Sequence, residues 1–202
     1  EKNSDIFAIV CSANCLQVDG HNDNGWDQGL VFMNNDSAWL QPPAYMTQMG
    51  HDSYQPNLLE GVLDQAIVDM NYSVSISDDG NSMSLKFMNY NPETIGLSTT
   101  LRNFTGNTNT VTVTSLTADS LTDTNTAENP ENVAPVTTTA ENAVQDNQLL
   151  ITLEPYSYTV VQIEKGSEPG DPVVPPAQTL AEAKAAADEA AAGITPDNSV
   201  TA

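Results

Sequence analysis

The sequence predicts a mainly β protein in which an antiparallel, jelly-roll-like β-sandwich follows a helix–strand–helix unit. Three observations support this class. Residues 67–165 carry several alternating segments rich in Thr, Val and Tyr, as β-strands do. Residues 29–34, GLVFMN, form a short continuous apolar run. From Gly166 onward, the composition changes to Pro-rich and then Ala-rich sequence. The predicted parts are residues 1–50, 51–165, 166–178 and 179–202.

The first part is expected to begin with a helix. Within EKNSDIFAIVCSANCLQV, Ile6, Ile9, Val10, Ala13 and Leu16 recur at helical spacing, and Asn3 or Ser4 could cap the helix. Cys11 and Cys15 would then share one face of this helix, where their geometry disfavours a disulfide and favours two buried thiols.

The run GLVFMN is typical of a strand that is buried on both faces of a parallel sheet. A loop and a short helix are expected to follow it, up to about residue 50. Since a helix leads into this strand, residues 1–50 are interpreted as part of an α/β unit.

The second part reads as a sandwich. Residues 67–91 alternate around DDGN, which predicts a β-hairpin, and LSTTLRNF, TVTVTSL and LLITLEPYSYTVVQIE predict further strands. A long polar loop is expected between the last two, over residues 117–148.

The last two parts read as a linker and the start of a helical module or a disordered tail. GSEPGDPVVPPAQ is Pro-rich and extended, and the Ala-rich sequence after it has Thr179 as a cap with Glu182 three residues on.

Charge limits the partners. Five Lys and Arg residues against 27 Asp and Glu residues give a net charge of −22. This charge repels phosphate, so nucleic acid is not expected as a partner, and no apolar run is long enough for membrane insertion. No cofactor or metal is expected, because DGHNDNGWD departs from a calcium loop in the place of its glycine and lacks the closing Glu.

The stretch GWDQGLVFMNNDSAWLQPPAYMTQM contains both tryptophans of the chain. Trp39 and Gln41 follow the predicted buried strand, at the strand end where barrel enzymes build their active sites. Aromatic faces and amides bind sugar rings and hydroxyls. The alternative is that Trp26 and Trp39 fill gaps in the core.

Three separated motifs carry a resemblance to one family. The stretch just quoted resembles the last strand and closing helix of the catalytic barrel in α-L-arabinofuranosidases of glycoside hydrolase family 51. NTAENPENVAP resembles a sandwich-loop pattern of that family through Asn125, Thr126, Asn129, Pro130, Val133 and Pro135. PYS, at Pro155 to Ser157, resembles the turn before its closing strand.

The resemblance implies that residues 1–50 end a (β/α)8 barrel, and that the two catalytic glutamates of a retaining glycosidase lie on earlier strands. No residue of this chain is therefore expected to be catalytic, and Asp27 and Asp36 are expected to cap or solvate loops. The family's arabinose-binding glutamine matches Gln41, and Trp39 is expected to line the cleft.

The predicted function is the C-terminal part of a secreted α-L-arabinofuranosidase that acts on arabinose-containing plant polysaccharide or oligosaccharide. An extracellular, cell-wall-associated location is expected, and the full-length enzyme could be a homo-oligomer. The alternative is a non-catalytic, extracellular β-sandwich that binds carbohydrate or cell wall.

Overall fold

The computed structural model describes residues 1–21, 25, 27–104 and 108–166. The predicted linker and helical module therefore lie outside the described residues, apart from Gly166, and so does Trp26. The described residues, up to Gly166, belong to one compact unit. None of the described helices is long and apolar enough to cross a membrane.

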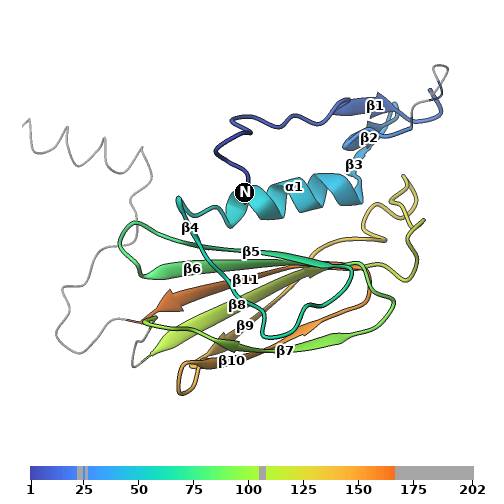
Figure 1. Cartoon of the computed structure of the whole chain (residues 1–202). Helices are drawn as coiled ribbons and strands as arrows, with labels where there is room; N and C mark the ends of the chain where they lie inside the picture. The colour runs from blue at the N-terminus through green and yellow to red at the C-terminus, as the bar shows by residue number, and fades with distance from the viewer. Residues whose placement is uncertain (22–24, 26, 105–107, 167–202) are drawn as a thin grey trace, which may run out of the picture. The chain divides into compact units, whose positions relative to one another are not determined.

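A six-stranded antiparallel sheet is the largest element of this unit (Figure 1). Each neighbouring pair runs antiparallel, as expected for a sandwich. In spatial order its strands are β4 (Asn57–Leu59), β5 (Met70–Ile76), β6 (Ser82–Asn89), β11 (Ser157–Lys165), β8 (Asn109–Leu116) and β9 (Val136–Glu141).

A second antiparallel sheet, of β7 (Ile95–Thr100) and β10 (Gln148–Leu153), covers one face of the first. The core lies between them because alternate side chains of each strand point inward. The buried members include Leu85 and Phe87 of β6, Ile151 and Leu153 of β10, and Ile163 of β11. The predicted β-sandwich is confirmed.

Residues 16–40 form a separate three-stranded sheet of β1 (Leu16–Val18), β2 (Val31–Met33) and β3 (Ala38–Leu40). β1 pairs with β2 in parallel, and β2 pairs with β3 antiparallel. The strand predicted within 29–34 is therefore present, with one parallel neighbour. Its burial differs from the expectation: Phe32 is buried, but Val31 and Met33 on the other face are partly exposed, so the strand is not buried on both faces.

The predicted N-terminal helix is wrong. Residues 2–6 form turns, the segment up to Cys15 has no regular helix, and Leu16 begins a strand. Ile6, Phe7, Ile9 and Val10 are all exposed. A short amphipathic helix is marginal without a surface to pack on, and the described residues provide none for these side chains. Cys11 and Cys15 are free and exposed, so the expectation of buried thiols is also wrong.

The predicted short helix is present as α1 (Pro42–Asp52). It lies against the face of the six-stranded sheet that is turned away from β7 and β10 (Figure 1). Met49 of α1 packs in a buried cluster with Leu116 and Val160 of the sheet and with Val133, and Tyr45 borders this cluster.

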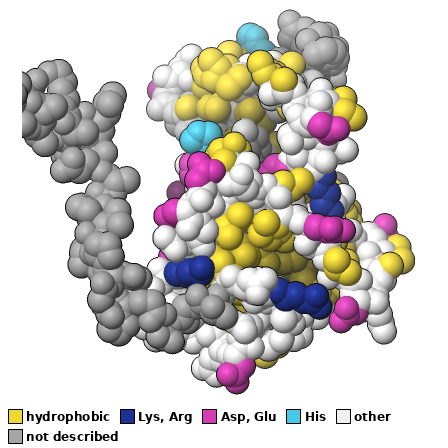
Figure 2. Space-filling model, turned by 60° about the vertical axis from the view of Figure 1, so that its left-hand side comes forward, with side chains coloured by type: hydrophobic (Ala, Val, Ile, Leu, Met, Phe, Trp, Pro, Cys, Tyr) yellow, Lys and Arg dark blue, Asp and Glu magenta, His cyan; other side chains and the backbone are white. Residues whose placement is uncertain are grey.

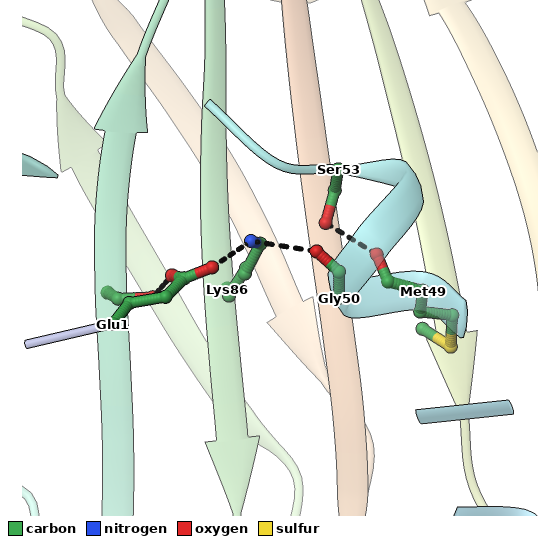
Figure 3. A network of polar contacts seen from close by, with 6 residues as sticks. Glu1, Met49, Gly50, Ser53 and Lys86 are labelled. Carbon is green, nitrogen blue, oxygen red and sulfur yellow. Dashed lines mark hydrogen bonds and ion pairs between the residues drawn. The ribbon is translucent and has the colours of Figure 1, made fainter. Parts of the chain in front are cut away.

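A polar network fixes the end of α1 to the same face (Figure 3). Buried Lys86 of β6 forms an ion pair with Glu1 and donates a hydrogen bond to the Gly50 carbonyl at 3.3 Å. Ser53 donates to the Met49 carbonyl at 2.5 Å. A cation is favourable here because the last carbonyls of a helix carry partial negative charge.

One expectation about the sandwich needs correction, because the predicted loop 117–148 contains strand β9 and the start of β10. The expected turn at Pro155 to Ser157 lies between β10 and β11. Tyr156 in that turn has a φ of 48°, so it belongs to neither strand, because β-structure requires negative φ.

Candidate functional site

A hairpin projects from the carboxyl end of β2, where the sequence places the candidate site. Its turn is closed by Asn34, whose Oδ1 accepts hydrogen bonds from the backbone N–H of Asp36 at 2.9 Å and of Ser37 at 2.8 Å. The Asn34 N–H in turn donates to the Ser37 carbonyl at 2.9 Å. Asp36 is exposed in this turn, as expected.

Trp39 lies at the centre of β3, opposite Phe32 of β2, with 6.3 Å between the ring centroids. Its side chain is only 4% exposed. The indole Nε1–H donates a hydrogen bond to the backbone carbonyl of Asn125 at 2.9 Å. Trp39 therefore fills a buried site, and its one polar group is hydrogen-bonded to a loop of the sandwich.

Gln41 immediately precedes α1 and is 8% exposed. Its Nε2 donates to the same Asn125 carbonyl at 2.7 Å, and its Oε1 accepts from the Asn125 backbone N–H at 3.1 Å. The Gln41 backbone N–H donates to the Leu30 carbonyl at 2.9 Å. The structure thus brings the two predicted site residues together on one backbone position of the sandwich.

Asn125 also uses its side chain to join the two segments. Its Nδ2 donates to the carbonyls of Leu40 at 2.7 Å and Val133 at 3.0 Å, and its Oδ1 accepts from the Val133 N–H at 2.7 Å. Asn125 is 2% exposed. In the sequence, Asn125 stands out only as part of a motif, and nothing there indicates its contact with Trp39, Leu40 and Gln41. The motif itself was the signal that could have found it.

The loop that carries Asn125 is held internally by the motif residues Thr126 and Asn129, and also by Asn132. The Asn129 N–H donates to Thr126 Oγ1 at 3.1 Å, and the Thr126 N–H donates to the Asn129 carbonyl at 3.2 Å. Asn132 Nδ2 reaches the Thr124 carbonyl at 3.2 Å. The Asn-, Thr- and Val-containing pattern therefore describes a loop that presents Asn125 in a fixed position.

Gln17 is a second buried side chain that makes several hydrogen bonds, and it lies in β1, on the other side of β2 from β3. Its Oε1 accepts from the backbone N–H of Gly29 at 2.9 Å and of Gln28 at 3.2 Å, and its Nε2 donates to Asp27 at 3.1 Å. A Cβ at Gly29 would lie 2.6 Å from the Gln17 Cβ, so this close approach requires glycine.

The arrangement supplies amides, hydroxyls and a tryptophan rather than acid–base groups. In the described ranges, no three or more His, Cys, Asp or Glu side chains are grouped so that they could hold a metal ion. Figure 2 shows Asp and Glu side chains spread over the visible face. What these residues do at the end of β2 is hold the hairpin and the sandwich loop together through buried hydrogen bonds.

The described residues thus form an antiparallel β-sandwich, one loop of which is hydrogen-bonded to a hairpin of a separate, partly parallel sheet. Residues 1–157 match the family described as the α-L-arabinofuranosidase C-terminal domain. The chain belongs to this family.

Solved structures of such enzymes have the same fold. The arabinose-bound MgGH51 α-L-arabinofuranosidase is 20% identical, with a TM-score of 0.69, over 82% of this chain and 25% of that one. The Thermotoga maritima enzyme in complex with arabinose is 22% identical, with a TM-score of 0.56, over 67% and 31%. A family 51 enzyme from Bifidobacterium longum is 18% identical, with a TM-score of 0.52, over 67% and 28%.

The chain therefore spans less than a third of the length of each of these three proteins. No curated protein sequence matches it significantly.

Proposed function

We propose that this chain is the C-terminal part of a glycoside hydrolase that releases arabinose from arabinose-containing plant polysaccharides or oligosaccharides. The observation that carries the proposal is the family match over residues 1–157, which includes the parallel strands β1 and β2 as well as the sandwich up to the start of β11. The parallel pair disfavours an isolated carbohydrate-binding sandwich, because parallel sheets occur almost only in α/β proteins with both faces covered.

The two catalytic carboxylates of this reaction would come from a part of the enzyme outside this chain. A retaining glycosidase needs an acid/base and a nucleophile about 5 Å apart. Asp27 is bound to Gln17, and Asp36 lies in the exposed hairpin turn. Neither has the setting of a glycosidase carboxylate, so the chain alone is proposed to be inactive.

Gln41 and Trp39 remain the proposed substrate contacts of this chain. A glutamine amide offers two N–H groups and two oxygen lone pairs, and Asn125 takes one of each. The other N–H and lone pair suit a sugar hydroxyl. The contacts of the structure support a second role for both residues, which is to hold the hairpin against the sandwich. Secretion to the cell exterior, in association with the cell wall, belongs to the same proposal.

The test compares two purified proteins on an aryl α-L-arabinofuranoside: the 202-residue chain, and a longer protein that includes the upstream coding sequence. The longer protein should release arabinose, and the chain alone should not. Turnover by the chain alone would contradict the proposal that the catalytic carboxylates lie outside this chain. A longer protein that binds arabinan but hydrolyses nothing would favour the non-catalytic binding module.

A further inference from the structure

We propose that Asn125 of the sandwich is a positioning residue, through which the sandwich sets the place of Gln41 and Trp39 at the proposed arabinose site. The inference rests on the proposed function for its kinetic consequence, and on the hydrogen bonds of this chain for its mechanism.

The polar groups of Asn125 are all engaged in hydrogen bonds. Its carbonyl accepts from Trp39 and Gln41, its N–H donates to Gln41, and its side chain bonds to Leu40 and to Val133. Four of these hydrogen bonds cross to residues 39–41, which lie 84 to 86 positions earlier in the chain. Because Asn125 is buried, water cannot replace a bond that is lost.

Asn125 is itself held firmly. Val133, its partner on the other side, is 3% exposed and packs with Met49, Leu116 and Val160. The hydrogen bonds between Thr126 and Asn129 close the loop between these two anchors. Asn125 is therefore also held from the sandwich side, through its side-chain bonds to Val133 and through the closed loop between them.

The short hairpin of β2 and β3 needs this support from Asn125. β2 and β3 have three residues each, and their connecting turn is exposed. Within the described residues, the side-chain amide of Gln41 is held by Asn125 on both its oxygen and its nitrogen. Since a displacement of about 1 Å in a substrate-positioning group can cost about a hundredfold in rate, this support bears directly on catalysis.

The chain offers a matched control in Asn109. Its side chain makes the same paired contact with a valine backbone, donating to the Val144 carbonyl at 3.1 Å and accepting from the Val144 N–H at 3.0 Å. It is 7% exposed, close to Asn125. Both of its partner segments belong to the sandwich, so it holds a loop together without touching the hairpin.

The experiment compares Asn125→Asp with Asn109→Asp. Each variant keeps the acceptor oxygen and replaces the N–H donors of the side chain with a second oxygen. In the 202-residue chain, we expect hydrogen exchange at the Trp39 indole N–H to rise at least tenfold in Asn125→Asp and less than twofold in Asn109→Asp. Trp26→Phe in all samples leaves one indole signal. Equal exchange rates in the two variants would overturn the inference.

If Asn125→Asp does not fold, Gln41→Glu serves in its place, because it removes the donor to the Asn125 carbonyl from the other side. The same rise in indole exchange is expected, and its absence would overturn the inference.

In the longer protein, Asn125→Asp should lower kcat/KM on an aryl arabinofuranoside at least tenfold, mainly through a higher KM. Asn109→Asp should stay within twofold of the unmodified protein, at a temperature where both are folded. A loss that is the same in both variants would reduce Asn125 to a structural residue. An unmodified longer protein without activity would instead refute the proposed function, and the indole exchange would still decide whether Asn125 sets the hairpin.

Discussion

The carbonyl of Asn125 accepts hydrogen bonds from two side chains, the Trp39 indole and the Gln41 amide. A carbonyl has two lone pairs, so it can accept both. All three residues are buried, and a donor or acceptor left without a partner there costs about 1–3 kcal/mol. The stability of this junction therefore depends on each partner separately.

For this reason, Gln41→Ala should lower the free energy of unfolding of the chain by about 1–3 kcal/mol, measured by urea denaturation. Gln48→Ala is the control, because Gln48 is exposed on α1. In the longer protein, Gln41→Ala should also lower kcat/KM roughly tenfold or more, at about 1.4 kcal/mol per decade. Lowered stability with normal kinetics would restrict Gln41 to the holding role.

Glu1 gives the stability a dependence on pH. Burial raises the pKa of this carboxyl, but hydrogen bonds from Lys86 and Ser73 and the positive charges of Lys86 and the N-terminus outweigh it, so the pKa lies below the ordinary 4.5. A lowered folded-state pKa contributes stability that is present above the unfolded pKa and lost as the pH falls through the folded value.

We therefore expect the Tm difference between the unmodified chain and Glu1→Gln to be largest near pH 7 and to shrink once the pH falls below about 4.5. Glu60→Gln, at an exposed site, should show little difference at any pH. A constant Tm difference from pH 7 to pH 3 would contradict this assignment.

The sequence alone identifies Gln41, Trp39 and the motif around Asn125 as candidates, but it does not show that these residues are in contact. Hydrogen bonds across more than 80 positions leave no local periodicity. The role of Lys86 could not be predicted for a related reason. It sits in a strand with apolar neighbours on the other face, and its partners lie at the start of the chain and at the end of α1.

The helix α1 owes its place to packing as well as to its sequence. Pro42 and Pro43 suit its first turn, where the backbone N–H groups need no helical partner. The preceding Gln41 makes no capping side-chain hydrogen bond, because its amide is engaged with Asn125. Most of the stabilisation of a helix of 11 residues must then come from its buried side.

Met49 and Met46 of α1 allow a direct test of that dependence. Met49 is 7% exposed and Met46 is 40% exposed. Met49→Ala should lower the free energy of unfolding by about 2–5 kcal/mol, because it removes buried atoms and leaves a cavity. Met46→Ala should cost well under half as much in the same thermal or urea titration. Similar losses would mean that α1 is not held by this cluster.

The strands divide into those that a pattern reveals and those that it does not. β5 and β6 alternate around a turn in which Gly80 has a φ of 72°, and the predicted hairpin is present. β9 was missed because its residues are exposed, so no apolar alternation marks it. Its antiparallel backbone pairing with β8 is what makes it a strand, and hydroxyl contacts such as Thr114 with Thr137 at 3.0 Å accompany that pairing.

Taken over residues 1–166, the fold class was predictable, but the state of the first segment was not. The sandwich has its own hydrophobic core, so the apolar side chains that alternate along its strands are buried against one another. The first segment has helical spacing but leaves Ile6, Phe7, Ile9 and Val10 exposed. Periodicity predicts a helix only where a surface is present to bury the apolar face. In the proposed enzyme, that surface would belong to the catalytic domain.

This difference predicts uneven stability within the chain. β1 is an edge strand of the small sheet, and its Leu16 and Val18 are exposed, whereas Val160, Val161 and Ile163 of β11 are at most 2% exposed. β11 is paired on both sides along its length, but β2 is paired over only three residues with each neighbour. Few buried contacts and short ladders mean a low cost of local opening.

Native-state hydrogen exchange of the 202-residue chain should therefore show Val31, Phe32 and Met33 exchanging at least a hundredfold faster than Val160, Val161 and Ile163. In the longer protein the gap should narrow, because parallel neighbours and a covered apolar face would then protect β2. Equal protection of β2 and β11 in the chain alone would contradict this. It would mean that the sandwich, through Asn125 and α1, is enough to hold the small sheet closed.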